Sequence, residues 1–274
     1  KNNTEDLTEA ELLEKAQAQA YSNAVNTQWR SKALDSRYEP GSTFKAVVLA
    51  SALEEGVVSE NDTFYCSGSY KVAGYDKPIS CSKHSGHGTQ TLAQAVQNSC
   101  NPAFMQIGQR LGIDKYYDYF EAFGLKEQTG IDLPGEASAA GNIWDRDKMS
   151  GVDLAVASFG QRIEVTPIQM ITAACAVING GRLMQPYLLK EALSPEGTVL
   201  YRAQPRVVSN PISEETSQTM RLLLEAVVEK GGAKNAAVPG YRIGGKTGTA
   251  QVYKDGRVVS NVHIGSFIGF APID

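Results

Sequence analysis

Three short motifs stand in a fixed order along the 274-residue chain, and each lies in a different kind of backbone pattern. The motifs are STFK at 42–45, SCN at 99–101 and KTGT at 246–249. The first opens a helical apolar pattern, the second separates two helical patterns, and the third lies on a late β-like pattern. A fold that uses all three must bring a helix start, an inter-helix turn and a strand to one cleft.

The order of the patterns predicts an α+β fold, with helices first and strands at the end. The predicted helices are 8–24, 43–55, 91–111 with a break at 99–102, 114–123, 166–178 and 213–230. Thr8 and Glu11 suit a capping box at the first helix. The predicted strands are 241–243, 250–253 and 263–270, with a turn at Asp255-Gly256, and loop or irregular patterns cover 61–90 and 128–150.

Composition limits the kinds of partner. Hydrophobic residues make up 42% and charged residues 20% of the chain, which is ordinary for a globular protein of one large domain or two lobes sharing a core. The formal net charge is -4 and no Lys/Arg block exceeds a pair, so no nucleic-acid partner is expected. No apolar run approaches the roughly 18 residues of a membrane helix.

Ser42 and Lys45 can act as a nucleophile and its base. Pro40-Gly41 predicts a turn that places Ser42 at a helix start, where free N–H groups and the helix dipole stabilise an oxyanion. Lys45 follows three residues later on the same helix face. A desolvated lysine near another cation loses its proton and can serve as a base. As an isolated pattern, the pair is better explained by an N-cap serine and a solvated lysine.

Ser99 and Asn101 lie between two helical segments, where side chains can point into a cleft. Serine can pass on a proton, and asparagine offers a donor and an acceptor to a substrate amide. As an isolated pattern, both residues are better explained as caps for the helix that opens at Pro102.

The KTGT motif follows two glycines, which allow a ligand to approach the backbone closely. Lys246 and two hydroxyls can hold a carboxylate, and the strand edge can pair with a peptide. Residues 240–247 also satisfy the phosphate-binding pattern G-x-x-x-x-G-K-[ST]. That reading requires a strand before the first glycine and a helix after the motif, whereas strand patterns lie inside the motif and after it.

Together, the three motifs resemble those of penicillin-binding proteins and serine β-lactamases. The match to the transpeptidase domain of class B penicillin-binding proteins, of the sporulation and elongation type of Gram-positive bacteria, extends over about residues 30–272. Further matching stretches are YEPG at 38–41, GHG at 86–88, GIDLPGE at 130–136, GQ at 160–161 and TP at 166–167. The resemblance implies an antiparallel sheet flanked by helices, an all-helical lobe, and an active site between them.

The resemblance also implies a role for each motif residue. Ser42 would form the acyl ester, Lys45 would be its general base, and Ser99 would relay the proton to the leaving group. Asn101 would orient the substrate amide, and backbone N–H groups of the first and third motifs would form the oxyanion hole. The remaining substrate-binding residues would be Lys246, Thr247, Gly248 and Thr249. The implied donor is a stem peptide ending in D-Ala-D-Ala, β-lactams would acylate the same serine, and no cofactor or metal is expected.

Cys66 and Cys81 lie close to two histidines, His84 and His87, so the segment can be read as a zinc site or as a disulfide loop. The spacing lacks the Cys-x-x-Cys hook of common zinc sites. Because the resembled family works outside the membrane, where disulfides persist, a Cys66–Cys81 disulfide is the preferred prediction. His87 is predicted to be structural, and Cys175 is predicted to be a buried small hydrophobe.

The resemblance finally implies a larger parent protein. Residues 1–274 would be a transpeptidase domain shortened at both ends, without the anchor and pedestal that place full-length relatives on the extracytoplasmic face of the cell membrane beside a glycosyltransferase partner. Two alternatives share the motifs: a serine β-lactamase and a β-lactam sensor without turnover. Glu127, Glu136 and Glu164 precede the third motif, but none has the Glu-x-x-x-Asn context of a class A deacylating base.

Overall fold

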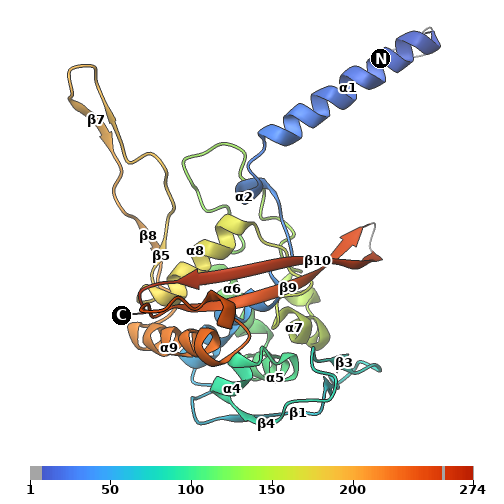
Figure 1. Ribbon diagram of the computed structural model, residues 1–274, viewed down its shortest axis with the longest axis vertical. Helices are drawn as coiled ribbons and strands as arrows, with labels where there is room; N and C mark the ends of the chain where they lie inside the picture. Colours follow the sequence, from blue (N-terminus) through green and yellow to red (C-terminus); the bar gives the residue numbers. More distant parts are fainter. Residues whose placement is uncertain (1–7, 255–256, 274) are drawn as a thin grey trace.

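The computed structural model of the protein describes residues 8–254 and 257–273 and has the predicted α+β architecture (Figure 1). Its helices are α1 (Glu9–Trp29), α2 (Lys32–Asp35), α3 (Lys45–Glu54), α4 (Leu92–Gln97), α5 (Asn101–Leu111), α6 (Ile113–Ala122), α7 (Gly151–Ala157), α8 (Pro167–Ile178) and α9 (Glu214–Lys230). Short 3-10 turns lie at η1 (Gly41–Thr43), η2 (Arg146–Lys148) and η3 (Lys234–Ala236).

The described strands form five antiparallel pairs. They are β1 (Thr63–Cys66) with β4 (Gly88–Thr91), β2 (Ser69–Tyr70) with β3 (Ile79–Ser80), β5 (Leu183–Met184) with β8 (Val207–Ser209), β6 (Glu191–Leu193) with β7 (Val199–Arg202), and β9 (Gly244–Lys254) with β10 (Arg257–Phe270). The long β9–β10 pair runs across the molecule, with α8 and α9 beside it (Figure 1). It is the predicted antiparallel sheet, and α9 packs on β9.

Reciprocal side-chain caps explain where several helices begin. Thr8 and Glu11 form the predicted capping box of α1, and Thr166 with Gln169 forms another at α8. The same arrangement opens α4 and α7, and the Ser213 hydroxyl accepts the Thr216 N–H at the start of α9. Each cap satisfies N–H groups that have no partner within the helix, so the capping residues predict where these helices begin.

Helix α3 lies at the centre of the core and carries the first motif. All eight residues from Lys45 to Ala52 are buried, as expected of a helix that is apolar on nearly every side. It packs against α5 and α6 of the helical lobe and against α8 and α9 beside the sheet. The two halves of the fold therefore meet at α3.

The predicted strand at 241–243 is wrong, because β9 begins only at Gly244. The Tyr241 N–H donates to the Val238 carbonyl in a turn, and the Arg242 guanidinium pairs with Glu225 of α9. These contacts hold the segment off the sheet. The predicted turn at Asp255-Gly256 lies outside the described residues.

Two parts of the chain stand away from the main body in Figure 1: α1 and the β6–β7 hairpin. Helix α1 has no buried residue, although Leu13, Tyr21 and Trp29 are large and apolar. Within the described residues, no helix is both long and apolar enough to cross a membrane.

Candidate active site

Ser42 lies in the 3-10 turn η1, before α3, which begins at Lys45 rather than at residue 43 as predicted. The preceding Gly41 has φ 54°, and its N–H donates to the Gly160 carbonyl at 2.8 Å. A Cβ on Gly41 would lie 2.8 Å from the Thr249 carbonyl oxygen. Glycine is therefore required both by the left-handed backbone and by the close approach of β9, which brings the first and third motifs together.

Lys45 points from the first turn of α3 toward the second motif. Its Nζ donates to the Ser99 carbonyl at 2.7 Å and to Asn101 Oδ1 at 2.7 Å, and it lies 3.1 Å from Ser99 Oγ. Only 1% of the residue is exposed. The expectation that the first two motifs share a cleft agrees with these contacts.

Lys246 reaches the same hydroxyl from β9. Its Nζ lies 2.9 Å from Ser99 Oγ and donates to the Thr247 carbonyl at 2.9 Å. The Ser99 hydroxyl thus bridges two amines, one from each half of the fold. The structure brings all three motifs to one point.

The two amines differ in how their burial affects protonation. Burial, aided by the positive charge of Lys246, lowers the pKa of Lys45 well below its ordinary value. Burial lowers the pKa of Lys246 to about 8. A neutral Lys45 has two N–H groups, which the Ser99 carbonyl and Asn101 Oδ1 accept, and its lone pair is left to take a proton.

The turn that carries Ser99 is conformationally strained. Ser99 has φ 49°, a left-handed value that costs a non-glycine residue roughly 1–2 kcal/mol. Backbone bonds from the Ser99 N–H to Val96 and from the Cys100 N–H to Ala95 hold the turn between α4 and α5. The strained backbone therefore lies where the Ser99 hydroxyl contacts Lys45 and Lys246, which is where strain is commonly retained for function.

The third motif alternates along β9. Lys246 and Gly248 are buried, whereas Thr247 is half-buried and Thr249 is exposed. A Cβ on Gly248 would lie 2.5 Å from Ser266 Oγ and 3.0 Å from the Pro40 carbonyl. Because residues two apart share a strand face, Thr247 and Thr249 lie on the opposite face of β9 from Lys246 and Gly248.

The phosphate-binding reading of this segment is wrong. Gly245 to Thr247 lie inside β9, which continues to Lys254 and pairs antiparallel with β10. A phosphate-binding loop needs a helix at that point, because its N–H groups cradle the phosphates.

Several stretches that match the resembled family serve the scaffold. The Glu39 carboxylate accepts the Arg162 N–H at 2.7 Å, next to the Tyr38–Val165 bridge that leads into the Ser42 turn. Asp132 accepts the N–H groups of Leu188 and Leu189. Glu136 accepts the N–H groups of Thr129 and Gly130.

The cysteines are arranged differently from the prediction. Cys66 and Cys81 are both free thiols in the structure, so the predicted disulfide is not formed there and remains a prediction. They lie beside Cys100 and His87, with His84 exposed and outside the group. The sequence reasoning missed Cys100 as a member, and its position inside the second motif was the available signal.

Cys175 is exposed, not buried as predicted. Ile171, Cys175 and Ile178 recur on one face of α8 and line a small apolar cavity of about 110 Å³ beside β10. Periodicity alone could not show that this face borders a cavity. His263 lies on β10 opposite Gln251, as a sheet residue.

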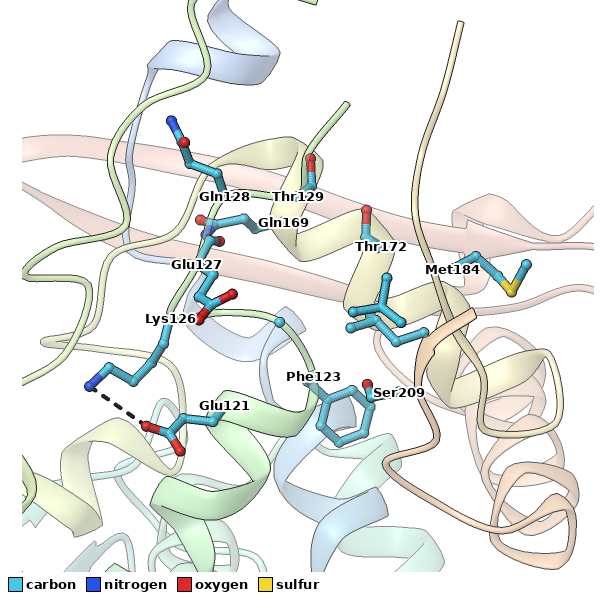
Figure 2. A pocket seen from close by; sticks show the side chains of 13 residues that line it. Glu121, Phe123, Lys126, Glu127, Gln128, Thr129, Gln169, Thr172, Met184 and Ser209 are labelled. Carbon is cyan, nitrogen blue, oxygen red and sulfur yellow. Dashed lines mark hydrogen bonds and ion pairs between the residues drawn. The ribbon is translucent and has the colours of Figure 1, made fainter. Parts of the chain in front are cut away.

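A larger cavity of about 450 Å³ lies away from the three motifs (Figure 2). It is lined by the end of α6 and the chain after it, by Gln169 and Thr172 of α8, and by Met184 and Ser209. The Lys126–Glu121 ion pair lies at its margin. None of the site residues predicted from the sequence lines it.

Comparison with known proteins agrees with this geometry. The family model for the penicillin-binding protein transpeptidase domain matches residues 6–274. The chain is 48% identical over 241 residues to stage V sporulation protein D of Bacillus subtilis, covering 87% of this chain and 37% of that protein. The chain thus spans about two fifths of the curated relatives it matches.

Solved structures of related domains superpose well. The D,D-transpeptidase domain of a peptidoglycan glycosyltransferase from Eggerthella lenta has a TM-score of 0.79 at 31% identity, covering 96% of this chain and 64% of that one. Penicillin-binding protein 3 of Mycobacterium tuberculosis, in complex with aztreonam, has a TM-score of 0.81 at 31% identity, covering 89% and 55%. The chain belongs to the penicillin-binding protein transpeptidase domain family.

Proposed function

We propose that this chain is the catalytic domain of a peptidoglycan D,D-transpeptidase that works through an ester on Ser42. The observation that carries the proposal is the convergence of Lys45 and Lys246 on Ser99 Oγ, at 3.1 and 2.9 Å. One amine is set to be neutral and the other to carry charge near neutral pH. That pairing supplies a base and a carboxylate anchor within one site.

Acylation follows from these positions. The neutral Lys45 takes the Ser42 hydroxyl proton, and Oγ attacks the carbonyl carbon of the penultimate D-Ala. N–H groups of Ser42 and Thr249 stabilise the tetrahedral oxyanion. When the C–N bond breaks, the proton passes from Lys45 through Ser99 Oγ to the nitrogen of the leaving D-Ala.

The donor peptide binds along β9. Protonated Lys246 and the Thr247 and Thr249 hydroxyls hold its terminal carboxylate, and the Asn101 amide bonds to the peptide backbone. The amine of a second stem peptide then passes a proton through Ser99 to Lys45 and attacks the ester carbonyl. When the C–Oγ bond breaks, Lys45 returns that proton to Ser42 Oγ. A β-lactam acylates the same serine, but its leaving nitrogen remains tethered in the opened ring.

The β-lactamase alternative needs a base that activates water. Three glutamates between the second and third motifs are candidates for this base, and each has another contact or location. Glu136 accepts two backbone N–H groups, and Glu164 lies 3.7 Å from Arg37. Glu127 lines the cavity of Figure 2. The described contacts of these side chains therefore favour a stable acyl-enzyme over hydrolysis.

The biological setting is part of the same proposal. We place the domain on the extracytoplasmic face of the cell membrane, within a longer protein that works beside a glycosyltransferase. The support is the family membership and the 48% identity to a sporulation protein.

The test is acylation by a fluorescent penicillin, followed by peptide mass mapping. We expect one stable adduct on Ser42, none in Ser42→Ala, and cross-linking of stem peptides from lipid-linked substrate. Lack of label on folded wild-type protein, or a label that Ser42→Ala retains, contradicts the acyl-enzyme. Fast release of hydrolysed drug indicates a β-lactamase, and stable label without cross-linking indicates a sensor.

A further inference from the structure

A group of four metal-binding side chains lies directly behind the Ser99 turn. Cys66 ends β1, Cys81 follows β3, His87 precedes β4, and Cys100 caps α5. Their ligand atoms all lie within 4.8 Å of one another, and Cys81 Sγ is 3.7 Å from His87 Nδ1. The three cysteines are at most 1% exposed, and His87 is half-buried.

The spacing of these atoms fits one tetrahedral metal ion. A zinc ion bound at roughly 2.3 Å to sulfur and 2.0–2.1 Å to nitrogen separates its ligand atoms by about 3.5–3.8 Å. Three cysteines and one histidine form a common structural zinc set, and thiolates favour zinc over calcium or magnesium. We propose that Cys66, Cys81, His87 and Cys100 bind one Zn²⁺ and thereby fix the Ser99 turn.

The backbone around the four side chains is tightly folded. The Cys81 N–H donates to the Gly68 carbonyl at 2.8 Å, and the His87 N–H donates to the Cys66 carbonyl at 3.1 Å. A Cβ on Gly86 would lie 2.5 Å from that same carbonyl, so only glycine permits the approach. These bonds bring Cys66, Cys81 and His87 together.

A disulfide accounts for less of the arrangement. A Cys66–Cys81 bond would use two of the four side chains and leave Cys100 and His87 beside it without a role. Zinc uses all four. Because four protein ligands close the coordination sphere, the site is structural rather than catalytic.

The location gives the ion a positioning role. Cys100 lies between Ser99, whose backbone is left-handed, and Asn101, which accepts a hydrogen bond from Lys45. A metal bond to Cys100 holds both neighbours in place from the far side of the turn. The four ligands are positioning residues, because none of them touches the reacting atoms.

The test measures metal content, independently of any activity. The whole chain, purified under reducing conditions without chelator, is expected to hold one Zn²⁺ per chain and to bind Co²⁺ with the absorption of a tetrahedral thiolate site. Cys81→Ser and His87→Ala are expected to lose stoichiometric metal. Cys175→Ser removes an exposed thiol outside the group and is the matched control, with metal content unchanged.

A second measurement addresses the positioning role. Chelation of the wild-type protein is expected to raise amide hydrogen exchange at residues 96–104 and to slow acylation, and added Zn²⁺ is expected to reverse both. Cys175→Ser should behave as wild type in each case. If the reduced chain binds no Zn²⁺ on reloading, if the metal survives both ligand substitutions, or if Cys66 and Cys81 form a disulfide in protein purified as expressed, the proposal is wrong.

Discussion

At the scale of single residues, the site depends on two lysines that share one hydroxyl but differ in charge. Lys45 Nζ and Lys246 Nζ lie 3.1 and 2.9 Å from Ser99 Oγ. The burial of Lys45 and the neighbouring cation favour its neutral amine, whereas Lys246 keeps its proton up to about pH 8. In the proposed mechanism, Lys45 is therefore the base and Lys246 carries the anion-binding charge.

This assignment predicts a bell-shaped pH profile for acylation by β-lactams. The rate rises with pH as Lys45 loses its proton, because only the neutral amine accepts the Ser42 proton. The rate falls as pH passes about 8, because Lys246 then loses the charge that holds the carboxylate. Stopped-flow measurement of the second-order acylation rate across pH gives both limbs.

Lys246→Arg separates the two limbs, because arginine stays charged at any pH in the range. In the pH profile of this variant, we expect the fall in acylation rate to shift to higher pH, whereas the rise at lower pH stays at the wild-type position. An unchanged melting temperature would show that the variant is folded. A variant profile that superimposes on the wild-type profile would contradict the assignment to Lys246.

At the scale of elements, the contact between η1 and β9 positions Ser42, the proposed nucleophile. Gly41 is left-handed and lies against the Thr249 carbonyl, so its missing side chain sets the distance between the first and third motifs. Gly56, after α3, is also left-handed at φ 64°, but a Cβ there would meet nothing within 4 Å.

Gly41→Ala and Gly56→Ala therefore form a matched pair. Both lose roughly 1–2 kcal/mol of unfolding free energy from left-handed strain. Gly41→Ala is expected to lose about a further 1 kcal/mol or more from overpacking, and to acylate at least about tenfold more slowly. Urea unfolding and the acylation rate measure the two effects, and equal losses for both variants would disprove the role of the β9 contact.

At the scale of the whole molecule, the sequence predicts most helices but little of the packing between them. Capping boxes at Thr8 and Thr166 and the cap at Ser213 define helix starts through local chemistry, so periodicity finds these elements. Short pairs such as β5–β8 were not predicted, because two or three residues give no readable alternation. The segment 241–243 was misassigned because its Arg242–Glu225 contact is distant in sequence.

The site shows the same limit. The order of the motifs predicts that Lys45, Ser99 and Lys246 meet, because each motif implies its own backbone setting. Cys100 joins Cys66, Cys81 and His87 only because the irregular segment 61–90 folds onto α5. No local sequence pattern predicts that contact.

Helix α1 provides a prediction about the molecule as a whole. Because it buries no residue, deletion of residues 1–29 is expected to change the unfolding free energy by at most about 0.5 kcal/mol and to leave β-lactam acylation unchanged. Thermal and urea unfolding of the shortened chain check this. A large loss would mean that α1 packs on the body in solution.

If the proposed function holds, the left-handed backbone at Ser99 limits which substitutions β-lactam selection can fix. The turn favours glycine or asparagine, whereas the bridge between Lys45 and Lys246 needs a short hydroxyl. Glycine would relax the turn and abolish the proton path, and threonine would keep the hydroxyl but add a branched carbon to a strained position. We therefore expect β-lactam selection to leave Ser99 unchanged and to select substitutions at residues that surround the turn.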